Sequence, residues 1–144
     1  MQAQNLKNHT RLVPSYHFVL WSVVLALDIL AILQLITVLN ERQGLLPSAI
    51  FVLIAVALSI SAIQIRRFPL IAQDRAIRAE EKLRHFVLTG KLPDSRLTLA
   101  QIIALRFASD EELAGLTERA VMENLSSSDI KKAIQQWKAD YYRV

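Results

Sequence analysis

One carboxylic acid lies in the middle of a long apolar stretch near the start of the chain. Asp28 is the twelfth of 23 residues in segment 17–39 and the only charged residue there. If this segment crosses a membrane, Asp28 lies near the midplane, where a charged carboxylate costs about 2.5–3.5 kcal/mol on insertion scales. Such a residue is typical of a proton relay or ion site, or of a hydrogen bond that holds helices together, and it can also be tolerated without a role. All three interpretations stay open, and we favour the hydrogen bond between helices.

Two further polar side chains lie in the apolar stretches. If segments 17–39 and 45–65 pair centre to centre, Asp28 lies level with about residue 56, and Ser59 lies roughly 4.5 Å farther along. Ser59 is therefore the predicted partner of Asp28 within the chain. Gln34 follows Asp28 by six residues, about 240° around a helix, so these two side chains do not share a face.

A basic run follows the second apolar stretch. We interpret its arginines as contacts to anionic lipid headgroups, worth about 1 kcal/mol for each well-placed side chain. The residues are Arg66, Arg67, Arg75 and Arg78. Nucleic acid is the alternative partner, but a basic run beside an apolar stretch favours lipid, and we expect no nucleic acid.

Aromatic residues gather in the last eight positions of the chain. Trp137, Tyr141 and Tyr142 are side chains suited to anchor an interface with a partner protein. The alternative is that Trp137 closes the core of a small helical bundle. The sequence favours neither of these over the other.

Recognisable catalytic chemistry is missing from the sequence. Cysteine is absent, which excludes disulfides, cysteine–zinc sites, iron–sulfur clusters and thiol nucleophiles. No H-E-x-x-H, Walker A or G-x-G-x-x-G motif occurs, and the three glycines are isolated. We therefore expect a non-enzymatic protein with no catalytic residue, metal or cofactor.

Two apolar helices must position the buried polar groups. Hydrophobic residues make up 53% of the 144 residues and charged residues 21%, and the charges are largely excluded from segments 17–39 and 45–65. At 1.5 Å per residue, each segment covers a hydrocarbon core of roughly 30 Å. The short link 40–44 predicts a tight antiparallel transmembrane hairpin. The polar residues 1–16 and the length of the first segment argue against a cleaved signal peptide.

Charge predicts the orientation of this hairpin. Residues 1–16 carry a net charge of +2, the link 40–44 is neutral, and residues 66–84 carry six basic against three acidic residues. Basic residues gather on cytoplasmic flanks, so we expect both termini in the cytoplasm and the link outside.

The segment after the second span is predicted to be a basic juxtamembrane helix with a linker, residues 66–96. Helix formers dominate it, Gly90 is suited to its C-terminal end and Pro93 prevents its continuation. Apolar positions form a stripe at helical spacing: Ala72, Ala76, Ala79, Leu83, Phe86 and Val87.

Residues 97–144 are predicted to form a cytoplasmic helical module. Three N-terminal capping signals follow one another, at Thr98 with Gln101, at Ser109 with Glu112, and at Ser126 with Asp129. We expect the last helix to cover residues 127–142, with Ile130, Ala133, Ile134, Trp137 and Tyr141 on one face.

Four stretches resemble a family of small bacterial membrane proteins that is classed only as a domain of unknown function. They are Gln4–Leu20, Gln73–Arg84, Ile102–Leu113 and Ile130–Val144. The resemblance implies a two-span architecture and a bacterial origin. It implies no activity, substrate, cofactor or site residue.

Together these observations predict an all-α membrane protein, a transmembrane hairpin followed by a cytoplasmic helical module. We expect it in the bacterial inner membrane as a non-enzymatic scaffold or accessory subunit. Its partners would be the bilayer and either further copies of itself or a larger membrane complex. The alternative is an oligomeric proton- or ion-conducting or transport protein centred on Asp28. Two spans cannot enclose a path alone, so that function needs several copies.

Overall fold

The computed structural model of the chain describes residues 4–6, 8–9 and 11–141. The described part is helical and contains no β-strand, which confirms the expected all-α class. Its contacts divide the chain into two units, Leu12–Pro69 and a second one that combines Met1–Arg11 with Leu70–Val144. Each unit is described by itself below.

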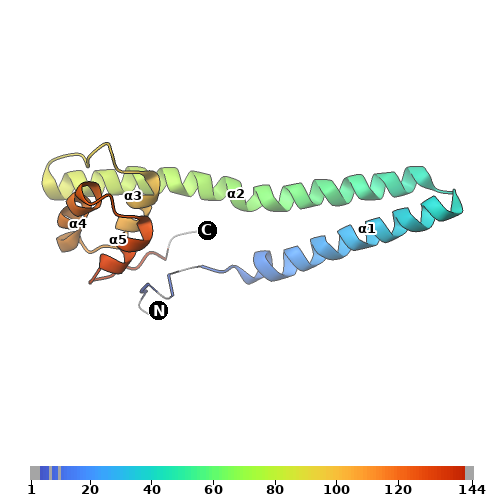
Figure 1. Cartoon of the computed structure of the whole chain (residues 1–144), viewed down its shortest axis with the longest axis horizontal. Coiled ribbons are helices and arrows are strands. Elements are labelled where there is room, and N and C mark those ends of the chain that lie inside the picture. The colour runs from blue at the N-terminus through green and yellow to red at the C-terminus, as the bar shows by residue number, and fades with distance from the viewer. Residues whose placement is uncertain (1–3, 7, 10, 142–144) are drawn as a thin grey trace. The chain divides into compact units, whose positions relative to one another are not determined.

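Leu12–Pro69 forms a helical hairpin (Figure 1). A π-helical segment, η1 (Ser15–Leu20), leads directly into α1 (Trp21–Glu41), and three residues separate α1 from α2 (Leu45–Thr89). The turn is this short because Arg42 and Gly44 both adopt left-handed backbone conformations, with φ of 56° and 76°. Glycine takes that conformation without a steric penalty, which suits it to reverse the chain here.

α2 runs without an interruption through Pro69. Proline has no backbone N–H, so the carbonyl of Ile65 loses its usual helical donor, and the helix nevertheless continues. The second apolar stretch and most of the predicted juxtamembrane segment therefore belong to one helix. It ends as predicted at Gly90, whose φ is 72° and whose N–H donates to the carbonyl of Phe86 at 2.8 Å.

Three short helices form a module beside the later part of α2: α3 (Leu99–Leu105), α4 (Asp110–Met122) and α5 (Ser127–Ala133). Each begins at a predicted cap. The hydroxyls of Thr98, Ser109 and Ser126 accept from the backbone N–H three residues on, and Thr98 forms a complete capping box with Gln101. These caps satisfy N–H groups that a helix start leaves without partners.

The module encloses one small apolar core. It is built from α3, α4, α5 and the segments between them, with Leu97, Leu125, Ala133 and Trp137 packed around its edge. Its buried members are Ala104, Leu105, Phe107, Ala108, Leu113, Leu116, Ala120, Ile130 and Ile134.

The prediction for the last helix is wrong in its length. α5 ends at Ala133, and Ile134 is already extended, with ψ of 123°. The reason lies in Glu112, whose carboxylate accepts from the backbone N–H groups of Gln135 and Gln136 at 3.1 and 2.9 Å. Those amides are thus withdrawn from helix formation. The chain then pairs with the segment after α3, where the N–H of Lys138 donates to the carbonyl of Phe107 at 2.8 Å.

Candidate functional site

The two helices of the hairpin face each other through a regular seam. Buried side chains recur every seven residues on both, which is the spacing of a helix pair with a heptad repeat. They are Val24, Ala31 and Val38 on α1, and Ser48, Ala55 and Ala62 on α2. Half-buried positions fall between them on the same faces, namely Asp28 and Leu35 on α1 and Val52 and Ser59 on α2.

Asp28 and Ser59 form a polar layer within this seam. The Ser59 hydroxyl donates to the Asp28 carboxyl, with Oγ 2.9 Å from Oδ2 and 3.2 Å from Oδ1. The structure thus contains the contact between Asp28 and Ser59 that was predicted from the rise per residue of two paired helices. A carboxyl in a mostly apolar seam penalises other registers, because a shifted hairpin leaves it facing apolar side chains.

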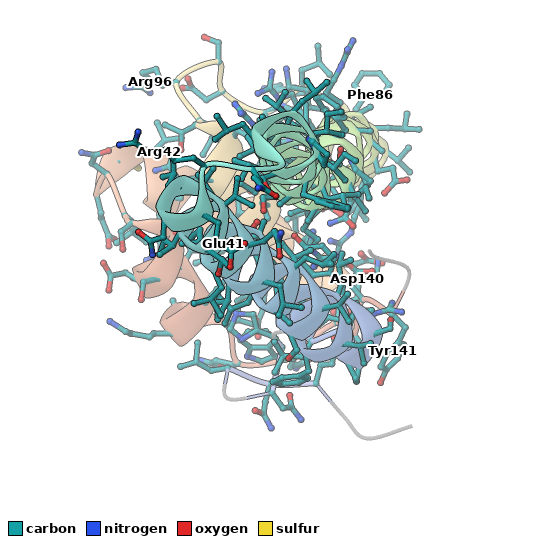
Figure 2. All side chains as sticks on the ribbon, turned by 90° about the vertical axis from the view of Figure 1, so that its right-hand side faces the viewer. Glu41, Arg42, Phe86, Arg96, Asp140 and Tyr141 are labelled. Atoms are coloured by element: carbon teal, nitrogen blue, oxygen red, sulfur yellow. The ribbon has the colours of Figure 1, made fainter. Side chains whose placement is uncertain are left out.

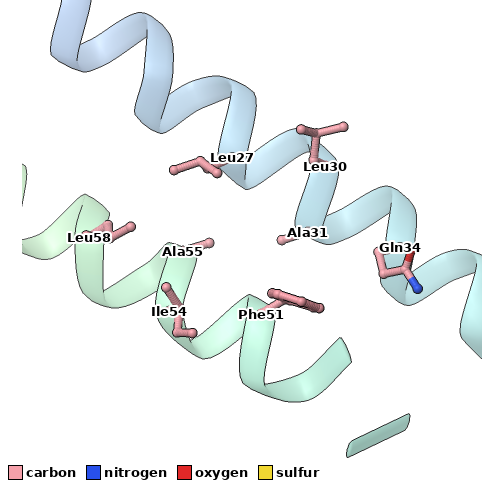
Figure 3. A pocket seen from close by; sticks show the side chains of 8 residues that line it. All are labelled: Leu27, Leu30, Ala31, Gln34, Phe51, Ile54, Ala55 and Leu58. Carbon is pink, nitrogen blue, oxygen red and sulfur yellow. The ribbon is translucent and has the colours of Figure 1, made fainter. Parts of the chain in front are cut away.

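Alanines next to this layer leave grooves on both sides of the seam. Figure 3 shows Ala31 and Ala55 pointing toward one another, with larger apolar side chains around a groove of about 300 Å³. A second groove of about 450 Å³ is lined by Asp28 and Ser59 themselves. The carboxyl is therefore reachable from the side of the hairpin.

Gln34 is not part of the polar layer. It lines the first groove, whereas Asp28 lines the second, as expected from their separation around α1. Its side chain is exposed, and it makes no hydrogen bond to any residue that the structure describes.

A second polar contact joins the open end of the hairpin. The Tyr16 hydroxyl in η1 donates to the carbonyl of Ala62 at 3.0 Å, and its ring lies 5.9 Å from the guanidinium of Arg66. Arg66 is therefore half-buried against an aromatic ring. The other predicted headgroup contacts, Arg67, Arg75 and Arg78, are exposed.

The aromatic residues near the C-terminus separate into different environments. Trp137 is half-buried against the module core, with its ring 5.1 Å from Phe107 and 5.8 Å from His9. This placement favours the core interpretation of Trp137. Tyr141 is exposed, and Tyr142 lies outside the described residues.

Arg84 ties α2 to the module and is the residue whose role the sequence did not reveal. Its guanidinium contacts the carboxylates of Glu81 at 3.0 Å and of Asp110 at 2.6 Å, and donates to the carbonyl of Ala108 at 2.7 Å. Its side chain is only 12% exposed. The hydrogen bonds from Arg84 lower the pKa of the Asp110 carboxyl below its usual value.

The N-terminal segment docks on the same module. The side-chain amide of Gln4 brackets the backbone of Asp140, donating to its carbonyl at 3.1 Å and accepting from its N–H at 2.9 Å. His9 packs edge-on against Phe107 at 5.7 Å. No sequence pattern signals these contacts, because they join residues more than ninety positions apart.

The model of a family described as a family of unknown function (DUF6526) matches residues 1–144. No curated protein and no solved structure matches the chain.

Proposed function

The chain belongs to that family of unknown function, and from its residues we propose that it anchors a small helical module to a membrane and presents it for protein–protein interaction. The hairpin is the anchor in this proposal, and Asp28 with Ser59 fixes the pairing of its helices. No residue is assigned a catalytic role.

The exposed apolar surface of the hairpin carries the proposal. Ser15–Glu41 and Leu45–Thr89 are long and apolar enough to cross a membrane, with a mean hydropathy of 2.4 in their most apolar windows. Only 17% of the residues in each window are buried. A core helix of a soluble protein would be mostly buried, whereas these side chains need an apolar surrounding that the chain itself does not supply.

The position of the N-terminal segment supports a common side for both termini. Residues of Met1–Arg11 pack against the module in one unit, and two spans return the chain to the side from which it started. Together with the basic residues around residues 66–84, this supports a cytoplasmic location of the module in the bacterial inner membrane. Arg67 and Arg78 are exposed and suited to anionic headgroups.

Extraction and mass measurement test this proposal. The full-length chain should stay in membranes washed with alkaline carbonate and require detergent for release. Purified in mild detergent, the intact complex should have a mass above 16.3 kDa, because the module holds either further copies or another subunit. Release by carbonate would contradict the anchor. A chain that is monomeric in mild detergent and also gives no crosslinked complex in intact membranes would contradict the interaction module.

The groove beside Asp28 supports a second candidate function. A carboxyl that lines a groove of about 450 Å³ is open to a neighbouring copy and to small ions. Several copies assembled around such carboxyls would form a proton- or ion-conducting path. Proton flux in liposomes that depends on Asp28 would favour this candidate over the anchor.

A further inference from the structure

Residues 70–89 of α2 have two contrasting faces. One face packs on the module, where Ile77 is 6% exposed and Arg84 makes its contacts to Asp110 and Ala108. The other face is uncovered although it is apolar, with Leu83 63% and Val87 73% exposed. Figure 2 shows Phe86 at the outer edge of α2.

The uncovered face has the spacing of a coiled coil. Its stripe consists of Ala72, Ala76, Ala79, Leu83 and Phe86, at intervals of four, three, four and three residues. This is the alternation of a and d positions in a heptad repeat, with Ala76 and Leu83 at a. At about 100° per residue, the stripe lies on the side of α2 opposite Glu81, which belongs to the module-facing side. Packing on the module thus leaves the whole stripe free.

We propose that this stripe is the interface with a second copy of the chain, in a parallel two-stranded coiled coil. The inference rests on the proposed function, because copies anchored in one membrane by the same hairpin present α2 in the same direction. Three alanines let the two helices approach closely, and Leu83 with Phe86 supplies the larger apolar contact.

The charges beside the stripe fit a parallel pair. Arg75 occupies a g position and Glu80 the following e position, and in a parallel coiled coil these face each other across the interface. An antiparallel pair would instead place the g residues Arg75 and Lys82 of the two copies near each other. Arg75 and Glu80 are exposed, and neither forms an ion pair with any residue that the structure describes.

The length of the stripe explains why the membrane matters for this pairing. It covers about two heptads, which is short for a coiled coil between free chains in solution. Anchoring in a bilayer confines the copies and aligns them, which raises their effective concentration. We therefore expect the dimer in membranes at native expression levels.

Crosslinking of single cysteines in the full-length chain tests the interface. The sequence has no cysteine, so an introduced thiol reports on its own position alone. Ala79→Cys lies in the stripe, and its neighbour Arg78→Cys, on a different face, is the matched control. Mild oxidation of intact membranes should give a species of about twice 16.3 kDa with Ala79→Cys. The Arg78→Cys variant should not give this species.

A charge exchange tests the contact between Arg75 of one copy and Glu80 of the other. On the Ala79→Cys background, Glu80→Arg should reduce crosslinking several-fold, because two arginines then face each other. Adding Arg75→Glu should restore it, because the pair is complementary again. Equal crosslinking at positions 78 and 79, a product with the mass of a different protein, or no rescue by the exchange would each overturn the proposal.

Carbonate extraction of the same variants separates this inference from the proposed function. Chains that remain in washed membranes without crosslinking refute the dimer and leave the anchor intact. Chains released by carbonate refute the anchor, and the parallel arrangement of the copies with it.

Discussion

At the scale of single residues, polar groups in this chain act on the pairing of helices. Asp28 and Ser59 join α1 to α2, and Arg84 joins α2 to the start of α4 through Asp110 and to the preceding segment through Ala108. Asp28 and Ser59 lie on helix faces that otherwise pack through mostly apolar side chains, and Arg84 lies on the same side of α2 as the buried Ile77. A shifted register would leave the polar group without its partner, and this cost makes one arrangement the most stable.

From the Asp28–Ser59 contact we predict graded effects of substitutions on the stability of the hairpin. Asp28→Asn should keep the hairpin intact, because a carboxamide oxygen still accepts from the Ser59 hydroxyl. Asp28→Leu and Ser59→Ala should each lower the stability of the hairpin by about 0.5–2 kcal/mol, the scale of hydrogen bonds between helices in bilayers. The measurement is unfolding of the full-length chain in mixed detergent micelles.

The control for this series is Ser61→Ala. The Ser61 hydroxyl donates within its own helix, to the carbonyl of Ala57 at 2.8 Å, so its loss should leave the hairpin pairing unchanged. A flux assay on the same variants addresses the conducting alternative. If Asn and Leu at position 28 abolish proton flux equally while unfolding is unaltered by either, the structural role assigned to Asp28 is wrong.

Arg84 and Asp110 predict how the module responds to substitution and to pH. Arg84→Met should destabilise the module by about 1–3 kcal/mol, because the largely buried guanidinium and its hydrogen bonds to carboxylate and carbonyl groups are lost. Arg78→Met, on an exposed position of the same helix, is the control and should cost little. Thermal unfolding followed by Trp137 fluorescence in a Trp21→Phe background reports on the module, since the chain has two tryptophans.

The pH dependence of that stability has a definite sign. The pKa of Asp110 is lowered in the folded chain by its hydrogen bonds to Arg84, so the unfolded chain binds protons more readily in acid. The contribution of Asp110 is complete above the ordinary aspartate pKa of about 3.9 and disappears as the pH falls through the lowered value. Arg84→Met should therefore flatten the loss of stability below about pH 4. An unchanged acid profile would contradict the pairing.

At the scale of elements, the sequence predicted those helix starts and ends that depend on interactions between neighbouring residues. The three caps at Thr98, Ser109 and Ser126 and the helix end at Gly90 depend on neighbouring residues, and all are present. The Asp28–Ser59 contact could also be predicted from the sequence. The pairing of Asp28 with Ser59 followed from helix geometry, because a short turn leaves two apolar helices little choice of register.

Contacts between residues far apart in the chain determine the features that the sequence did not predict. The helical pattern of residues 127–142 is genuine, but Glu112 takes the amides of Gln135 and Gln136 and ends α5 early. Arg84 contacts Glu81 on its own helix, but its further partners Ala108 and Asp110 lie more than twenty residues away. Neither outcome is encoded in a local pattern.

Glu112 therefore predicts a change in the last segment of the module. Glu112→Ala should release the amides of Gln135 and Gln136, and their hydrogen exchange should become faster. Glu118→Ala, an exposed acid on the same helix, is the comparison and should leave both amides protected. Slow exchange at both amides in Glu112→Ala would mean that another acceptor holds the segment.

For the whole molecule, the question is which surroundings cover the apolar side chains of the hairpin. The module has its own core, caps and ion pairs, whereas the hairpin exposes most of its large apolar side chains. A bilayer would resolve this contrast, because it solvates apolar helices whose backbone groups are already paired. The proposed interaction surfaces depend on this proposed membrane anchoring.

Cysteine labelling in spheroplasts tests that claim most directly, because the chain contributes no thiol of its own. Gln43→Cys lies in the turn between α1 and α2, and Ser128→Cys is exposed on α5. A membrane-impermeant maleimide should label Gln43→Cys in intact spheroplasts and Ser128→Cys only after the membrane is permeabilised. Labelling of Ser128→Cys in intact spheroplasts, or protection of Gln43→Cys there, would contradict the account.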